Sequence, residues 1–291
     1  MADTVNIFDE KPEAFFQDEG IIVHNISCQP GLTGLNVGYE DSMWRYDEFA
    51  DYILEWLLEF ALKYSDIKKV NHANSKRFLK QAAKAVYQTE KYKKRGEFGE
   101  LILHAIIREL FNSQPAISKL YYKTAPNDTV KGFDAVHIVE HEGELELWLG
   151  EAKFYTDIKE AINAVVQELD KHTQRDYLKE EFVLVSRKID NDWAYAKQIK
   201  DMMSSRKSLD ALFPRICFPV LLTYESNTVI NNQSTTDEFK KSLINELNQN
   251  YQTFNSKLNG SKLRIHLILL PLCNKNTLVE HLNDKLKGLQ E

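Results

Sequence analysis

Asp134, Glu151 and Lys153 are the residues of this sequence whose types and spacing could support catalysis. Two carboxylates that face each other on neighbouring strands can bind a divalent cation such as Mg²⁺ or Mn²⁺, because these ions prefer oxygen ligands. Lys153 follows Glu151 by two positions, so both side chains project from the same face of a strand. Its ammonium could orient a water molecule or stabilise developing negative charge, and the neutral amine could deprotonate that water. We therefore predict a site for a divalent metal ion at these residues.

A predicted β-hairpin brings these residues together. Residues 132–140 and 144–154 have the composition of strands, and the Glu-Gly pair at 142–143 can form a two-residue turn between them. In that register Asp134 lies directly opposite Glu151, where the two side chains are within contact distance. The same face continues with apolar residues, so we expect it to face the core.

An aspartate followed on the next strand by Glu-x-Lys resembles the active-site motif of the PD-(D/E)xK nucleases. The sequence departs from the motif at Phe133, which stands where the motif has proline, one of its looser elements. The resemblance implies an α/β fold with a mixed central sheet flanked by helices. It also implies a core with the order helix–strand–strand–strand–helix–strand. A hairpin held by a purely structural salt bridge is the alternative explanation of the pattern.

The helix predicted over residues 96–111 would precede the first strand of that core. In the nuclease interpretation this helix delivers a third carboxylate to the metal ion. Glu100 is the preferred candidate, because Gly99 before it would allow close approach of the backbone, and Glu97 is the alternative. Acidic residues in the first turn of a helix are also favoured by the helix dipole alone.

The remaining sequence predicts alternating helices and strands. Gln167, within one of these helices, is a polar residue that could position a water molecule or a phosphate. Pro219 within a predicted strand suggests an edge strand or a bulge. The predicted helices cover 44–63, 74–91, 157–172, 237–256 and 275–289, and the predicted strands cover 20–26, 118–124, 181–186, 216–224 and 263–270.

The chain is long enough for one large domain or two smaller ones. We expect residues 1–95 to form a mainly helical region that docks a partner, and residues 96–291 to form the nuclease domain with a C-terminal α/β extension. The first residues lack the features of a signal peptide, and no apolar run is long enough to span a membrane. Three widely separated cysteines fit a reducing compartment, so we predict a cytoplasmic protein.

Charge is unevenly distributed along the chain. The net charge is −6, yet residues 63–95 carry +9, with nine Lys and two Arg against two acidic residues. Within this segment, Lys76, Arg77, Lys80 and Lys84 are candidates for contact with a phosphate backbone or an acidic partner. A solvated helix face is the alternative.

Other kinds of active site find no support in the sequence. There is no phosphate-binding loop of the NTPase type, no zinc-ligand spacing among the eight histidines, and no serine nucleophile motif. His137 alternates to the opposite strand face from Asp134, so we expect a structural role for it.

Over nearly its full length the sequence resembles the nuclease subunits of the Hachiman anti-phage defence systems. The segments that carry this resemblance are Gly-Glu-Phe-Gly-Glu at 96–100, Gly-Phe-Asp at 132–134 and Gly-Glu-Ala-Lys at 150–153. The resemblance implies a bacterial nuclease that works with a separate superfamily 2 helicase and degrades DNA when triggered. The alternative is a catalytically silent subunit with the nuclease fold that docks or regulates the helicase.

Overall fold

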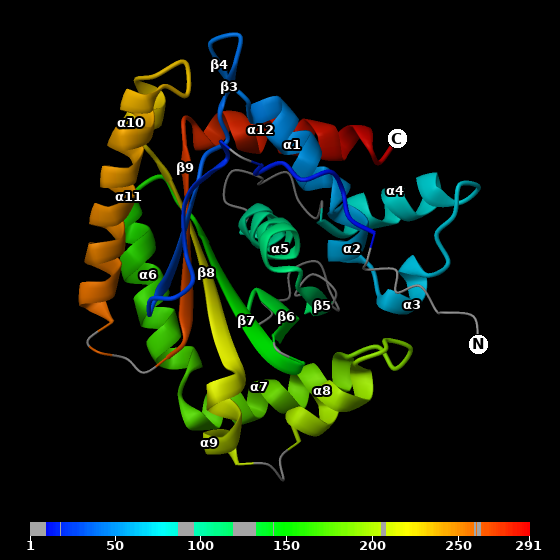
Figure 1. Cartoon of the computed structure of the whole chain (residues 1–291). Coiled ribbons are helices and arrows are strands. Elements are labelled where there is room, and N and C mark those ends of the chain that lie inside the picture. The colour runs from blue at the N-terminus through cyan, green and yellow to red at the C-terminus, as the bar shows by residue number, and fades with distance from the viewer. Residues whose placement is uncertain are drawn as a thin grey trace.

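A computed structural model describes residues 10–17, 19–86, 96–118, 132–141, 143–204, 208–258, 260 and 263–291. In these ranges seven strands form one sheet with the order β1-β2-β9-β8-β7-β6-β5 (Figure 1). Strands β2, β9, β8 and β7 run parallel, whereas β1, β6 and β5 pair antiparallel with their neighbours. The predicted α/β fold with a mixed central sheet is confirmed.

The strands of this sheet and of a separate two-stranded ladder have the following bounds: β1 (Ile21–Asn25), β2 (Gly31–Leu35), β3 (Tyr39–Glu40), β4 (Met43–Trp44), β5 (Gln114–Ser118), β6 (Ala135–His141), β7 (Glu144–Phe154), β8 (Ile216–Glu225) and β9 (Ile265–Leu272).

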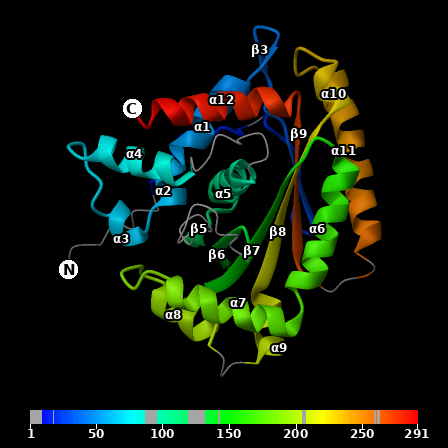
Figure 2. The ribbon, with the colours of Figure 1, turned by 180° about the vertical axis from the view of Figure 1, so that it is seen from behind.

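Helices cover both faces of the sheet (Figures 1 and 2). Helix α5 lies on one face with α1, α2 and α12 beyond it, α6 and α11 lie on the other face, and α7, α8 and α9 gather at one end. The helices are α1 (Tyr46–Glu55), α2 (Leu57–Ala61), α3 (Tyr64–Ile67), α4 (Ser75–Val86), α5 (Glu97–Phe111), α6 (Ile158–His172), α7 (Arg175–Lys188), α8 (Ala196–Met202), α9 (Leu209–Leu212), the 3₁₀ helix η3 (Phe213–Arg215), α10 (Asn227–Ile230), α11 (Asp237–Lys257) and α12 (Lys275–Gly288).

The register predicted for the central hairpin is confirmed. His141 pairs with Glu144, and Ala135 pairs with Gly150, as the two-residue turn requires. Asp134 lies one residue before β6, and its backbone N–H donates to the carbonyl oxygen of Gly150 at 2.9 Å. The hairpin therefore continues far enough to place Asp134 beside the end of β7.

The strand predicted over residues 181–186 is wrong, because this segment lies within helix α7. Leu178, Phe182 and Val185 are buried at helical spacing, whereas Val183 and Leu184 between them are exposed. A short apolar run fits a strand or a helix equally well, and here tertiary packing selects the helix. The strand that follows α6 in the sheet is instead β8, and α7 to η3 stand between them.

Pro219 was expected on an edge strand or at a bulge, and the edge expectation is wrong. Strand β8 is central, with β7 on one side and β9 on the other. Its pairing with β7 stops after Cys217 and resumes at Val220. Because proline has no N–H to donate, this gap in the ladder is where Pro219 is tolerated.

The elements of the N-terminal half compare with the sequence prediction as follows. The helix predicted over 44–63 divides at Trp56 into α1 and α2. The first strand of the hairpin sheet is β5, whereas 119–124 of the strand predicted at 118–124 lie outside the described residues. Strand β1 confirms the strand predicted over 20–26, and β1 and β2 join the common sheet through β9. No helix in the described ranges is long and apolar enough to cross a lipid bilayer.

A buried polar network connects these N-terminal helices to the central sheet. Glu59 of α2 accepts hydrogen bonds from Arg108 of α5 at 2.5 and 3.0 Å, and lies 3.0 Å from His104 Nε2. His104 Nδ1 in turn lies 3.2 Å from Nε2 of His137 on β6, and His137 Nδ1 lies 2.9 Å from Ser113 Oγ. His137 is thus buried on the α5 side, in agreement with the structural role expected for it.

Removing Glu59 should destabilise the protein, because Arg108 is fully buried and would lose its countercharge. We expect Glu59→Ala to lower the free energy of unfolding by about 3–5 kcal/mol. The exposed ion pair of Asp210 with Arg175 provides the control, and Asp210→Ala should cost less than about 1 kcal/mol. Denaturant unfolding measures both, and equal effects would contradict this account of the network.

Candidate active site

Side chains of β7 point alternately to the two helical layers. A Cβ atom at Gly99 of α5 would lie 2.9 Å from Phe154 Cβ and 3.7 Å from Ala152 Cβ, so these two residues face α5. Glu151 and Lys153 point the other way and contact helix α6. The close approach predicted for Gly99 is therefore confirmed.

The predicted acidic pair and lysine meet at the end of the hairpin. Asp134 Oδ2 accepts a hydrogen bond from the backbone N–H of Ala152 at 2.9 Å, which holds its carboxylate against β7. Lys153 Nζ lies 4.0 Å from Glu151 Oε2. Asp134, Glu151 and Lys153 are 6%, 1% and 8% exposed, respectively. The three side chains therefore form one buried cluster.

Burial and mutual repulsion dominate the electrostatics of this cluster. Burial, followed by the charge of Asp134, raises the pKa of Glu151 well above its usual value, although Lys153 acts in the opposite direction. Burial alone would lower the pKa of Lys153, but its hydrogen bond with Glu168 and the charges of Glu151 and Asp134 raise it. The cluster therefore favours the ammonium form of Lys153, and it disfavours the ionised form of Glu151 relative to an exposed carboxyl group.

Two residues of α6 that the sequence did not single out complete the cluster. Glu168 accepts a hydrogen bond from Lys153 Nζ, and His172 Nδ1 lies 2.5 Å from Glu151 Oε1. Their i, i+4 spacing places both on one helix face, and His172 continues the buried stripe of α6 that includes Leu169. A histidine at a buried position of an otherwise apolar helix face is the sequence pattern that could have identified His172 as a site residue. Gln167, the residue first considered, is exposed.

Glu100 is buried in the first turn of α5, next to Gly99, whereas Glu97 is only partly buried. Within the described ranges, no group of three or more His, Cys, Asp and Glu side chains is arranged to hold a metal ion. The role of Glu100 as a third ligand therefore stays a prediction, with Glu97 as the alternative.

The chemistry of Asp134 and Glu151 nevertheless fits a Mg²⁺ ion. Mg²⁺ is commonly held by only one or two carboxylates, and waters and substrate phosphates complete its coordination. The repulsion that raises the pKa of Glu151 is also what a divalent cation between the carboxylates would relieve. These two residues could hold the ion without a preformed cage.

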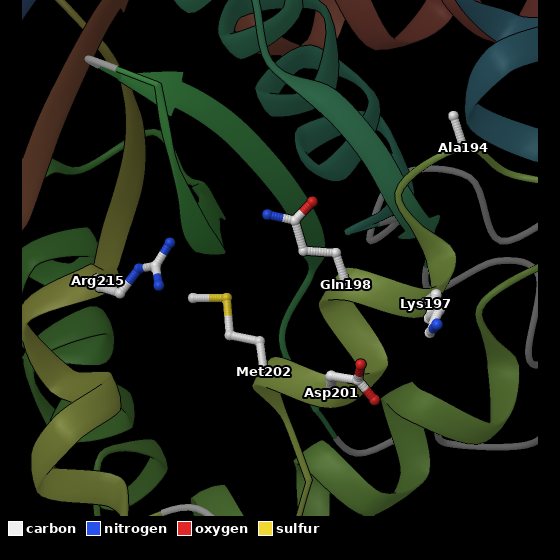
Figure 3. Close-up of a pocket in the computed structure, with 6 residues that line it drawn as sticks. All are labelled: Ala194, Lys197, Gln198, Asp201, Met202 and Arg215. Atoms are coloured by element: carbon white, nitrogen blue, oxygen red, sulfur yellow. The ribbon is translucent and has the colours of Figure 1, made fainter.

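A cavity of about 490 Å³ lies elsewhere (Figure 3). It is bounded by α8 and Arg215, and Figure 3 shows Arg215 and Met202 pointing toward each other across it. Arg215 Nε donates to the carbonyl oxygen of Leu145 near the start of β7, whereas Glu151 lies near its end. The cavity is therefore separate from the acidic cluster.

The four basic residues of α4 lie apart from the cluster. Lys76, Arg77 and Lys84 are exposed, and Lys80 donates to the backbone oxygen of Glu291 at 3.2 Å. Helix α4 lies at the periphery beyond α2 (Figure 1). These side chains could contact a partner or a phosphate backbone, but they do not belong to the acidic site.

The fold and the site define a mixed α/β protein with a buried acidic pair and a lysine on its central hairpin. A family model described as HamA matches residues 13–286, and the chain belongs to the HamA family. The family resemblance expected from the sequence is confirmed. Anti-bacteriophage protein A from Escherichia coli (strain K12) is 26% identical over 270 residues, covering 87% of this chain and 47% of that protein. The chain thus spans about half the length of this curated relative.

Replacing Glu151 with glutamine tests the electrostatic cost of the buried carboxyl group. Folding raises the pKa of Glu151 above its usual value of 4.5. At a pH below 4.5, the protonated side chain therefore contributes its full stabilisation to the folded state. That contribution is lost as the pH rises through the raised pKa. We expect Glu151→Gln to raise the melting temperature of metal-free protein at about pH 7, and to lose this advantage by about pH 4.

Melting curves recorded across this pH range in the presence of a chelator measure the difference between the two proteins. A difference that stays constant with pH would contradict the raised pKa of Glu151.

Proposed function

We propose that this protein is a metal-dependent deoxyribonuclease that acts in anti-phage defence together with a helicase subunit. The observation that carries the proposal is the buried cluster of Asp134, Glu151 and Lys153. Membership of the HamA family and similarity to a protein named for its action against bacteriophages support the defence role. The helicase partner is an expectation from the sequence resemblance.

Asp134 and Glu151 would hold Mg²⁺ or Mn²⁺ at the end of the hairpin, with Glu100 as a further candidate ligand. The bound ion would polarise the scissile phosphate and make a bound water molecule more acidic. Lys153, held as an ammonium, would stabilise the negative charge that develops on the phosphate or orient the attacking water. Glu168 keeps Lys153 in the site until a phosphate competes for its ammonium.

The charge distribution suggests why a partner is needed. A chain with net charge −6 neutralises few phosphates, so it should bind DNA weakly on its own. The basic face of α4 is the part of the described N-terminal region that could add phosphate contacts or dock an acidic partner surface. A partner that presents DNA would also restrain a nuclease that shares a compartment with the host chromosome.

Replacing Lys153 with methionine should abolish Mg²⁺-dependent DNA cleavage in protein that remains folded, with a lower melting temperature because Asp134 and Glu151 lose their countercharge. Methionine keeps the apolar stem in its buried position and removes only the ammonium. Lys159→Met, on the exposed face of α6, is the matched control and should retain full activity. The assay compares DNA degradation by the purified proteins, with and without the co-purified partner.

If Lys153→Met cleaves DNA at the wild-type rate, Lys153 has no catalytic role. No cleavage by the wild type under any of these conditions would favour the alternative, a catalytically silent subunit that docks a helicase.

Reversing the charge of Lys76, Arg77, Lys80 and Lys84 to glutamate should reduce DNA degradation by the complex while the acidic site stays intact. If these residues contact phosphates, the slope of log affinity against log salt should become shallower by roughly 0.9 per lost contact. If they dock the partner, co-purification should fail instead.

The control reverses four exposed lysines elsewhere, namely Lys159, Lys179, Lys241 and Lys257. Full degradation by the α4 variant, or equal loss in the control, would exclude a specific role for α4.

A further inference from the structure

The imidazole of His172 is fixed between two aromatic rings beside Glu151. The ring of Tyr177, from the first turn of α7, stacks on it with centroids 4.5 Å apart and planes 11° apart. Phe133 packs edge-on against it, with a centroid separation of 5.4 Å and an interplanar angle of 74°. Phe133 and His172 are themselves buried, so the imidazole has little room to change its rotamer.

This packing directs one nitrogen of the ring at the acidic pair. His172 Nδ1 lies 2.5 Å from Glu151 Oε1, while Glu151 Oε2 faces Lys153 at 4.0 Å. When Glu151 is ionised, the Nδ1–H donates to Oε1 and fixes the rotation of the carboxylate. The other oxygen of Glu151 then already points in one direction. Because the carboxylate is fixed before a metal ion binds, binding costs less side-chain entropy.

The same contacts assign a packing role to Phe133. It occupies the position at which the sequence departs from the nuclease motif, directly before Asp134. A proline there would stiffen the backbone before the aspartate. The Phe133 side chain instead packs against the imidazole of His172, which lies beside Glu151. The three rings therefore connect the residue before Asp134 to the imidazole beside Glu151.

We propose that His172 is a positioning residue that orients Glu151 for metal binding, and that Phe133 and Tyr177 hold its imidazole in place. This inference rests on the proposed function, since it assigns Glu151 to a metal ion. Hydrogen bonds to ligating carboxylates typically contribute about 10- to 100-fold to metal affinity.

Calorimetric titration with Mn²⁺ tests the role of His172 directly, without a substrate. His172→Phe keeps an aromatic ring between its neighbours but cannot donate a hydrogen bond to Glu151. We expect this variant to bind Mn²⁺ about 10- to 100-fold more weakly than the wild type. His172→Gln, whose amide can still donate, should recover part of the affinity. The control is His141→Phe, at the exposed last residue of β6 beside the hairpin turn, and it should lose none.

Cleavage assays separate positioning from catalysis. In His172→Phe, the Mg²⁺ concentration for half-maximal activity should rise by the same factor, while kcat at saturating Mg²⁺ changes less. Tyr177→Leu keeps the donor but removes the stacked ring, and should give a smaller loss of affinity, even if His172→Phe does not fold.

Unchanged Mn²⁺ affinity in His172→Phe and Tyr177→Leu, with tight binding by the wild type, would overturn this inference and leave the proposed function standing. A wild type that binds no Mn²⁺ would overturn the proposed function and this inference with it.

Discussion

Two buried carboxylates at the end of the central hairpin need positive charge, and the surrounding structure supplies it. Asp134 and Glu151 are almost inaccessible to water, so their mutual repulsion is weakly screened. Lys153, on the same strand, provides a permanent cation, and Glu168 holds that ammonium in the cluster. His172 satisfies one oxygen of Glu151, and the Ala152 N–H satisfies one oxygen of Asp134. A divalent cation would complete this compensation.

The scaffold around the cluster fixes its geometry from both sides of the sheet. On one side, Gly99 allows α5 to approach the end of β7 closely. On the other, α7 packs against the segment that leads to Asp134. Gly132 has φ +132°, a backbone conformation that favours glycine, and a Cβ atom there would also displace the Glu181 carboxylate, whose Oε2 would lie 2.6 Å away. Helix α7 thus supports the site, although its segment 181–186 was expected to be a strand of the sheet.

The sequence predicted the hairpin part of the site and missed the helical part, for physical reasons. Strand periodicity and a two-residue turn determine which residues oppose each other, so the meeting of Asp134 with Glu151 follows from local spacing alone. Contacts of Glu168 and His172 with β7 depend on how α6 packs across the sheet, which local spacing does not specify. The apolar run in α7 was ambiguous for the same reason, because burial on one side decides between helix and strand.

The central claim is that Asp134 and Glu151 together bind a divalent cation. Its most direct test is the melting temperature of the wild type and of Asp134→Asn with increasing Mn²⁺, in the absence of DNA. Binding to the folded state alone should raise the wild-type melting temperature progressively with Mn²⁺ concentration. Asp134→Asn keeps the side-chain shape and an oxygen to accept the Ala152 N–H, yet should show little or no shift. An equal shift in both proteins would contradict the claim.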